Sequence, residues 1–359
     1  MKAGIVGAGI MGQLLALGLL NAGWKVSLFD KNLGLDQANS SMTAAGLLTP
    51  ITELVKNNLL IAELGIDAIT RYWPEIFQQL NKPVYFQKRG SLLLAPARDQ
   101  GELTHFVEMI RNKLRHSAYQ PEQHIFRLDN ITEYEPELGK FGQGYYFPAE
   151  GCLDNQTLLQ NLQHYLSERG VSFYPTEVKK IIDNTVMVEK FNTSFDRVFD
   201  CRGLLAKDNF PNLRGVRGEL VFIQTQDVRI TRPLRLLNSR YSLYVVPRPQ
   251  GVYIVGASEI EAEDNGEISV KTLLELLAAA YYLHPGFAEA RVLKTMTHSR
   301  PTLPDQLPKI KYSQDLIAVN GLYRHGFLIA PSLVADILEF LQTGISSVNY
   351  PTLWEPFYD

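Results

Sequence analysis

The chain of 359 residues contains little cysteine and no long run of like charge. Its two cysteines, Cys152 and Cys201, stand far apart, and no C-x-x-C spacing occurs. This argues against a zinc site or a dithiol motif, so we expect no metal and two isolated thiols, with a disulfide between them left open. A net charge of −3 without a basic run does not favour nucleic acid or an anionic membrane as a partner.

The motifs of common hydrolases are also missing. There is no H-E-x-x-H sequence and no arrangement typical of a serine hydrolase. Hydrophobic residues make up 45% of the chain and charged residues 20%, which is typical of a globular protein. The length exceeds what one core usually serves, so we expect two domains.

The opening stretch, GIVGAGIMGQLLALGLLNAG (4–23), is apolar enough to raise the question of a signal peptide. Lys2 is its only basic flank, and no A-x-A cleavage site follows. Glycines interrupt the run, which argues against a membrane helix. We therefore expect no membrane span and a cytoplasmic location.

The same stretch fits a dinucleotide-binding unit. Residues 3–6 are predicted to form a short buried strand, residues 13–22 an apolar helix and residues 24–29 a second strand that ends at an acid, Asp30. A G-x-G-x-x-G motif joins the first strand to the helix. Strand, glycine loop, helix, strand and acid together make the full unit, whereas the glycine motif alone would be weak evidence.

Each residue of this motif has a physical role. Gly7 permits the tight turn, Gly9 lets the backbone approach a pyrophosphate, and Gly12 lets helix and strand pack closely. The start of the helix offers free N–H groups and a positive dipole end to the phosphates. Asp30 follows Gly12 by 18 residues, near the separation expected for a carboxylate that binds ribose hydroxyls.

Small residues fill the segment SSMTAAG (40–46). Small side chains leave room for a flat ligand against the backbone. The composition alone is equally consistent with a helix packed tightly on its neighbour.

Six segments, taken in order, resemble the D-amino-acid oxidase superfamily of FAD flavoproteins, within its glycine oxidase-like branch. The resemblance runs from residue 4 to about residue 340. It is carried by GAGIMG with Asp30, SSMTAAGLLTP (40–50), EGCLDNQTLLQNL (150–162), LYVVPRPQGVYIVGASE (243–259), SRPTLPDQLPKI (299–310) and NGLYRHGFLIAP (320–331).

The resemblance implies an α/β fold in which a Rossmann-like FAD-binding domain is interwoven with an α+β substrate domain built on an antiparallel sheet. We expect the FAD-binding domain to comprise residues 1–50, 150–215 and 300–359, and the substrate domain residues 51–149 and 216–299. The sequence supports this plan. The segments 218–226, 241–249 and 251–259 have the composition of antiparallel strands, 198–205 reads as a buried strand ending at Gly203, and a late helix is expected to begin near Gly326.

FAD is the cofactor that the resemblance implies. No cysteine lies near THSR (297–300), where some relatives attach flavin covalently, so we expect non-covalent FAD. Besides Gly7, Gly9, Gly12 and Asp30, the expected FAD-binding residues are Ser41, Thr43, Ala44, Ala45, Gly46, Gly203, Gly321, Tyr323, His325, Gly326 and Phe327.

Three residues are candidates for the catalytic site. Arg300 stands where the family places its carboxylate-binding arginine, and the planar guanidinium suits a carboxylate because it can form two parallel hydrogen bonds. Arg324 belongs to a loop that the family passes beside the flavin, but a loop arginine that contacts backbone carbonyls is as good an interpretation. Tyr244 matches the family's substrate-site tyrosine, with core packing as the alternative.

Two further residues have open roles. Glu53 could meet a substrate amine, although a helix cap is the simpler interpretation. Arg202 replaces a residue that is small in the family. It could reach the FAD pyrophosphate or partly close the site.

Two functions follow from the resemblance. The first is FAD-dependent oxidation of a small amine or amino acid, glycine oxidase-like, by hydride transfer to flavin N5 with O2 as the acceptor. The alternative is an accessory flavoprotein that modifies a partner quinoprotein oxidase during cysteine tryptophylquinone biogenesis, with little activity on free amino acids. A third possibility, an NAD(P)-dependent dehydrogenase, is weakened because nothing after Asp30 continues a nicotinamide-binding fold.

Overall fold

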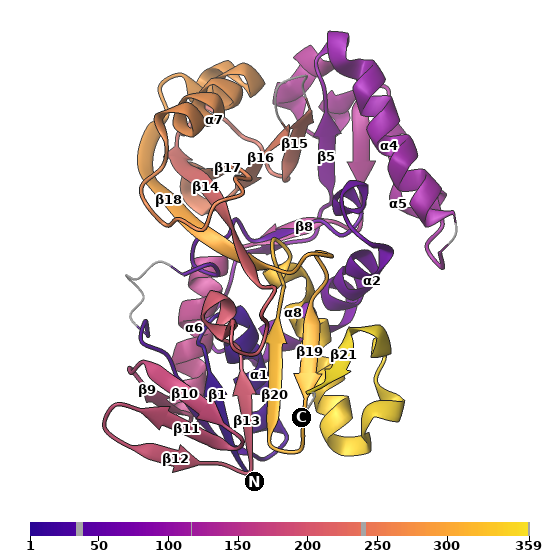
Figure 1. Cartoon of the computed structure of the whole chain (residues 1–359). Helices are drawn as coiled ribbons and strands as arrows, with labels where there is room; N and C mark the ends of the chain where they lie inside the picture. The colour runs from indigo at the N-terminus through magenta and orange to yellow at the C-terminus, as the bar shows by residue number, and fades with distance from the viewer. Residues whose placement is uncertain (34–38, 116, 238–241, 358–359) are drawn as a thin grey trace.

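The computed structural model describes residues 1–33, 39–115, 117–237 and 242–357. These residues form two lobes, each built around one large β-sheet (Figure 1). A seven-stranded sheet lies in the lobe that contains the start of the chain, and an eight-stranded sheet lies in the other lobe.

The seven-stranded sheet has the strand order β21-β19-β20-β13-β1-β2-β9. Strand β1 lies next to the central strand β13 and pairs in parallel with both β13 and β2. The strands are β1 (Lys2–Val6), β2 (Lys25–Phe29), β9 (Ser172–Tyr174), β13 (Arg197–Asp200), β19 (Lys309–Tyr312), β20 (Leu316–Asn320) and β21 (Trp354–Pro356).

The predicted dinucleotide-binding unit is present at the centre of this sheet. Helix α1 (Ile10–Asn21) joins β1 to β2, and its N-cap residue is Gly9. The helix starts three residues earlier than the sequence suggested, because the glycine motif itself forms the end of the loop and the first helical turn. The parallel order β13-β1-β2 places the carboxyl ends of these strands at one edge, where ligands bind in such folds.

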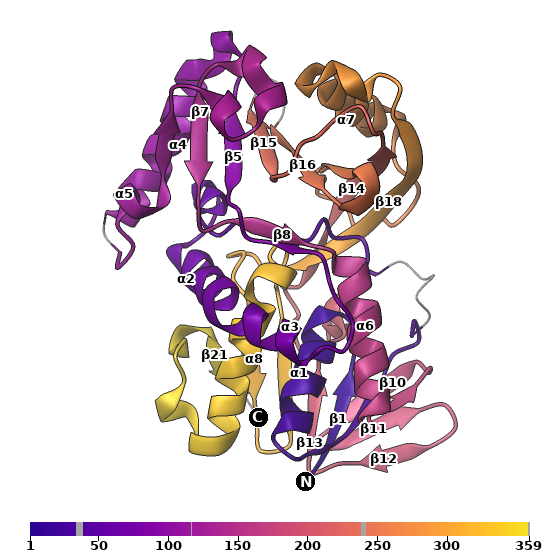
Figure 2. The same cartoon turned by 180° about the vertical axis from the view of Figure 1, so that it is seen from behind.

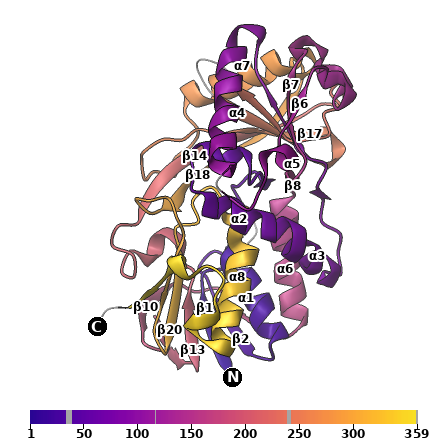
Figure 3. The same ribbon diagram turned by 90° about the vertical axis from the view of Figure 1, so that its right-hand side faces the viewer.

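Helices cover one face of the seven-stranded sheet, and a small sheet covers the other. Helices α1, α6 (Asn155–Glu168) and α8 (Gly326–Thr343) lie on the same side (Figures 2 and 3). The three-stranded sheet of β10 (Val178–Ile182), β11 (Thr185–Val188) and β12 (Asn192–Ser194) packs on the opposite side through a separate apolar cluster. By length and composition α8 could cross a membrane, but here it contributes buried residues to the main core.

The eight-stranded sheet has the order β18-β14-β17-β16-β15-β5-β7-β6. It is antiparallel, as predicted, except for the parallel pair β5 and β15. Its strands are β5 (Ser91–Leu94), β6 (Phe126–Leu128), β7 (Gly144–Phe147), β14 (Arg214–Gln224), β15 (Leu234–Leu237), β16 (Ser242–Pro247), β17 (Val252–Gly256) and β18 (Arg291–Thr302). A fourth, short sheet of β3 (Leu47–Leu48), β8 (Gly151–Leu153) and β4 (Phe86–Gln87) lies where the lobes meet.

Strand alternation gives the eight-stranded sheet two different faces. One face packs against α7 (Val270–Leu283) through alternate residues such as Val221, Val245 and Val255. Helix α4 (Gln100–Leu114) covers the β5–β7 end of the opposite face. The remainder of that opposite face points toward the seven-stranded sheet and holds the residues discussed below.

One local expectation was wrong, and one alternative left open by the sequence is now decided. Strand β13 ends at Asp200 rather than Gly203, because the chain turns there into a short 3-10 helix, Gly203–Ala206. The segment 40–46 forms a turn followed by extended chain, not a tightly packed helix.

The division into domains by residue range stays a prediction. Helices α2 (Leu59–Asp67) and α3 (Trp73–Gln79), which we placed in the substrate domain, lie beside α8 (Figure 3). The Trp73 indole donates a hydrogen bond to the carbonyl of Phe327 at 3.0 Å.

Candidate active site

A cavity of about 540 Å³ lies between the two large sheets. Residues from both lobes line it, and most of the residues singled out from the sequence are among them. Gly12 and Gly321 are not part of the lining. The predicted residues that line the cavity are Gly7, Gly9, Asp30, Ser41, Thr43, Ala44, Ala45, Gly46, Gly203, Tyr244, Arg300, Tyr323, Arg324, His325, Gly326 and Phe327.

The glycine loop is formed by backbone contacts that exclude side chains. Gly7 has φ of +107°, and a Cβ there would lie 2.3 Å from the carbonyl oxygen of Cys201. A Cβ on Gly12 would lie 1.9 Å from the carbonyl oxygen of Gly7. Gly12 therefore shapes the loop from behind the cavity, as its expected role in helix–strand packing requires.

Two side chains hold this loop from the cavity side. The Asp30 carboxylate accepts hydrogen bonds from the amides of Ala8 at 2.7 Å and Asn32 at 2.8 Å. The Ser41 hydroxyl accepts one from the amide of Ile10 at 3.0 Å. Asp30 is thus both an anchor of the loop and an acid that faces the cavity.

The residues present fit FAD at the phosphate end. The first turns of both α1 and α8 line the cavity, and their N-cap residues, Gly9 and His325, make no side-chain capping bond within the described structure. Apart from the Ile10 amide, which is bonded to Ser41, the first-turn amides of these two helices and their positive dipole ends are available to an anionic group.

The residues also fit a flat ring system beside the segment 41–46. Three side chains tie back carbonyl groups of this segment. Asn155 donates to the carbonyl of Ser41 at 2.9 Å, Gln156 to that of Met42 at 3.0 Å, and Arg248 to that of Ala45 at 2.6 Å. These bonds satisfy the carbonyl groups of the segment, so the segment presents mainly its small side chains to the cavity.

The floor of the cavity is formed in part by Arg235, Tyr244 and Leu220, which belong to one transverse row of the eight-stranded sheet. The register pairs Arg235 with Tyr244, Tyr244 with Gly256, Gly256 with Leu220, and Leu220 with Met296. Residues in register share a face, so Arg235 and Tyr244 stand side by side. The Tyr244 ring lies over Gly256, where a Cβ would come within 2.8 Å of it.

Arg300 enters this floor from β18. Its guanidinium lies directly over Gly218 of β14, where a Cβ would come within 1.9 Å of Nη2. The hydrogen bond that the structure gives it runs from Nη1 to the carbonyl of Ser258 at 3.2 Å. Within the described residues it has no carboxylate partner, and its burial lowers the pKa of Arg300. A guanidinium in this setting can bind an anion from outside the protein.

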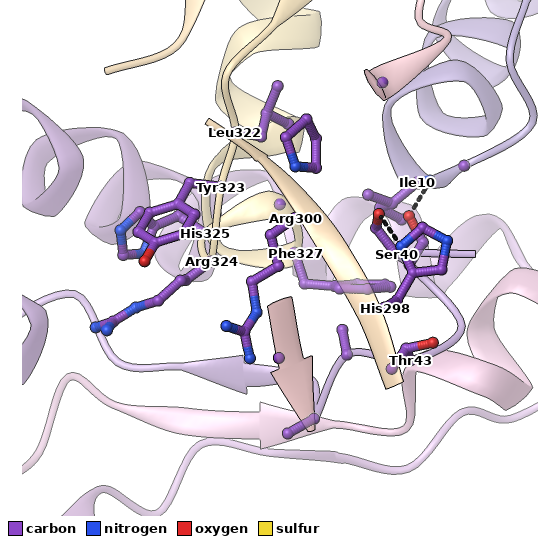
Figure 4. Close-up of a pocket in the computed structure, with 18 of the residues that line it drawn as sticks. Ile10, Ser40, Thr43, His298, Arg300, Leu322, Tyr323, Arg324, His325 and Phe327 are labelled. Atoms are coloured by element: carbon purple, nitrogen blue, oxygen red, sulfur yellow. Dashed lines mark hydrogen bonds between the residues drawn. The ribbon is translucent and has the colours of Figure 1, made fainter. Parts of the chain in front are cut away.

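Arg324 differs from Arg300 because it already has two carboxylate partners. It forms ion pairs with Glu53 and, at 3.1 Å, with Glu259. Figure 4 shows its side chain and that of Arg300 extending into the same part of the cavity, with His298 apart from them beside Ser40. Burial opposes ionisation of Glu259, but the charges of Arg324 and Lys56 and the hydrogen bonds from Lys56 and Tyr323 together outweigh it and lower the pKa of Glu259 to about 2.

Arg235 was not among the residues predicted from the sequence, and Glu53 was expected to cap a helix. Arg235 forms an ion pair with Glu53 across the cavity floor. Glu53 lies in the short 3-10 helix Thr52–Val55 and does not cap it. Burial alone would raise the pKa of Glu53, but the charges of Arg324 and Arg235 hold that pKa well below its usual range. The sequence does contain a signal for Arg235, because a single charged residue stands there between two apolar residues, Leu234 and Leu236.

Two other residues lie in defined environments. His325 is buried and lies 3.1 Å from the side-chain oxygen of Asn57, and burial lowers the pKa of His325 to about 4. Arg202 lines the cavity but forms a two-point ion pair with Asp200, both bonds at 2.8 Å, and a further pair with Asp208. Its charge is therefore neutralised by neighbouring acids.

Residues 2–338 match the model of a family described as FAD dependent oxidoreductase, named DAO. A Rhizobium etli protein assigned as the thiamine biosynthesis oxidoreductase ThiO is 34% identical over 344 residues, covering 96% of this chain and 97% of its own. A bifunctional ThiO/ThiG protein from Trichormus variabilis is 23% identical, and this chain spans 52% of its length.

Solved structures share the fold. Glycine oxidase from Geobacillus kaustophilus superimposes with a TM-score of 0.82 at 19% identity, covering 98% of both chains. Iminodiacetate oxidase from Chelativorans gives the same score and identity, covering 99% of both chains. At this level of identity the likeness establishes the fold.

Proposed function

The chain belongs to the DAO family of FAD-dependent oxidoreductases, and from this premise we propose that it oxidises a small amine or amino acid that carries a free carboxylate. The ThiO and glycine oxidase relatives support an amino-acid substrate of the glycine type. FAD, when bound, supplies the acceptor for the hydride that leaves the Cα–H bond at flavin N5.

The observation that carries this proposal is the environment of Arg300. Its guanidinium lies inside the cavity without a carboxylate partner among the described residues, whereas Arg235 pairs with Glu53 and Arg324 pairs with both Glu53 and Glu259. A buried, unpaired cation is costly, so it is expected where a ligand supplies the counter-charge. Tyr244, whose pKa is raised by burial, stands beside it as a neutral hydroxyl donor.

The residues of the floor would then orient the substrate. Arg300 would hold the carboxylate by two parallel hydrogen bonds, and Tyr244 would add a third contact. Fixing the carboxylate fixes the position of Cα against the segment 41–46, where the ring system fits. Leu220 and Leu243 would exclude water from this region of the cavity.

Glu53 is poorly suited to act as a general base. Both of its oxygens are bound by arginines, and its pKa is held low. We therefore expect the substrate amine to enter in its neutral form. Oxidation should become faster as the pH rises toward the pKa of that amine.

Anaerobic mixing tests the proposal. Purified protein with FAD bound should lose its yellow colour when glycine, sarcosine or a D-amino acid is added without oxygen. Arg300→Lys should reduce affinity for these substrates while the flavin spectrum stays normal, because lysine keeps the charge but not the planar fork. Readmission of O2 should restore the colour if dioxygen is the acceptor.

The alternative, oxidative modification of a partner quinoprotein, uses the same cofactor on a protein-bound side chain. No free carboxylate would then reach Arg300. Failure of every small amine to reduce the flavin, together with complex formation with such a partner, would favour this alternative. A cytoplasmic location likewise stays an expectation.

A further inference from the structure

Five side chains form a row of alternating charge along the cavity wall. The order is Arg235, Glu53, Arg324, Glu259 and Lys56, and each neighbouring pair is an ion pair. Glu259 pairs with Arg324 at 3.1 Å and with Lys56 at 2.8 Å. Every carboxylate in this row is therefore held between two cations.

The two carboxylates differ in depth. The side chain of Glu53 is 9% exposed and lies at the inner end, whereas that of Glu259 is 33% exposed. One oxygen of Glu53 accepts from Arg235 and the other from Arg324. Arg235 and Arg324 come from two different elements, β15 and the loop before α8, so the pair forms a cradle that Glu53 fills from a third element.

This cradle lies next to the proposed carboxylate anchor. Tyr244, Arg300, the cradle residues Arg235 and Arg324, and Glu53 all line the same cavity. Arg235 is the in-register neighbour of Tyr244 on β15. A ligand bound at Arg300 therefore lies within one small space with the cradle.

We propose that Glu53 is a specificity-determining residue that occupies the Arg235–Arg324 cradle with its own carboxylate. The site then accepts one carboxylate from the ligand, at Arg300, and rejects amines that carry a second carboxylate on their side chain. This inference rests on the proposed function, because it takes Arg300 as the anchor. Guanidinium groups bind any carboxylate of suitable geometry, so an internal one both fills the space and repels a second.

The proposal predicts that removal of Glu53 strengthens the binding of dicarboxylic acids. Glu53→Ala vacates the cradle and leaves both arginines without that counter-charge. The probes are non-reactive acids in pairs of equal chain length, namely malonate, succinate and glutarate against propionate, butyrate and pentanoate. Binding is followed by the change in flavin absorption and, independently, by the rise in Tm. Wild type should show no preference for the diacid of any pair, and Glu53→Ala should prefer one diacid by at least tenfold.

Three variants make the test specific. Glu53→Gln keeps the shape of the side chain but removes its charge, so a smaller gain in diacid preference is expected. This variant replaces Glu53→Ala in the test if Glu53→Ala does not fold. Glu53→Ala combined with Arg235→Gln should lose the gain. Glu259→Ala removes the other, more exposed carboxylate from Arg324 and should produce no preference for diacids.

Two results would overturn the inference. One is a folded, FAD-containing Glu53→Ala or Glu53→Gln variant that binds every diacid no better than its monoacid partner. The other, which needs no variant, is a wild type that already prefers a diacid. Ligand binding does not require reduction of the flavin, so failure of the proposed oxidation would be recognised separately, by wild-type protein that no amine reduces.

Discussion

Gly218 is predicted to determine the position of Arg300, although it cannot itself contact a ligand with a side chain. Gly218 lies within strand β14, where alanine meets no conformational barrier. Its added Cβ would lie 1.9 Å from Nη2 and 2.0 Å from Cζ of Arg300. Ordinary contacts are near 3.5–4 Å, so the guanidinium must move away from the floor in Gly218→Ala.

The magnitude follows from the bonds that would be lost. A hydrogen bond between charged groups contributes about 1.5–3 kcal/mol. Loss of one such bond lowers carboxylate affinity roughly tenfold to hundredfold, since about 1.4 kcal/mol corresponds to a factor of ten. FAD retention should be unchanged, because the glycine loop and the segment 41–46 are not displaced.

Titration with acetate or propionate, followed by flavin absorption, measures this effect. Gly215→Ala is the matched control in the same strand, because its Cβ would first meet Cγ of Glu263, an exposed side chain, at 2.8 Å. The control should bind carboxylates like wild type. If Gly218→Ala also binds them like wild type, Arg300 is not the carboxylate anchor in the position described.

Four further outcomes are expected. Asp30→Ala should weaken FAD binding by roughly tenfold to hundredfold, since about 1.5–3 kcal/mol of hydrogen bonding to a charged acceptor is lost; dialysis with absorbance at the flavin band measures it, and full retention would contradict the assignment. Arg300→Lys should lower affinity for small carboxylates at least tenfold while the flavin spectrum stays normal; an unchanged Kd would argue against a two-point contact. Substrate oxidation should speed up with pH along the titration of the substrate amine, and a profile that instead follows a group of the free enzyme would indicate a general base. Burial raises the pKa of Glu150 to about 7 from an ordinary 4.5, so wild type should lose about 3 kcal/mol of unfolding free energy as pH rises between about 4.5 and 7; Glu150→Gln should lack this loss in denaturant titrations, and identical pH slopes would refute it.

The central unit of the fold could be predicted because its signals are local. The glycine spacing, the apolar helix and the acid at position 30 lie within one short stretch, and the structure has β1, α1 and β2 there. The antiparallel pairing of β14, β16 and β17 was likewise visible as alternating apolar residues. The parallel pair β5 and β15 was not, because residues 92 and 234 meet only through the assembled sheet.

Site residues could be predicted where they belong to a sequence motif. They could not be predicted where the site depends on contact between two segments far apart in the sequence. Arg300 and Tyr244 follow from motifs and both line the cavity. The partners of Arg324 could not be read from the sequence, since Glu53 lies 271 residues away. Arg235 becomes a site residue only through its register with Tyr244, which depends on how β15 and β16 pair.

Anaerobic reduction of the bound flavin is the most direct test of the proposed function. Protein containing FAD would be mixed without oxygen with glycine, sarcosine and D-alanine, and the flavin absorption followed, with Arg300→Lys alongside. The account predicts that at least one of these monocarboxylic amines bleaches the wild-type flavin fully and that Arg300→Lys requires at least tenfold more of it. Wild-type flavin that stays oxidised with every small amine, although dithionite reduces it, would contradict the account.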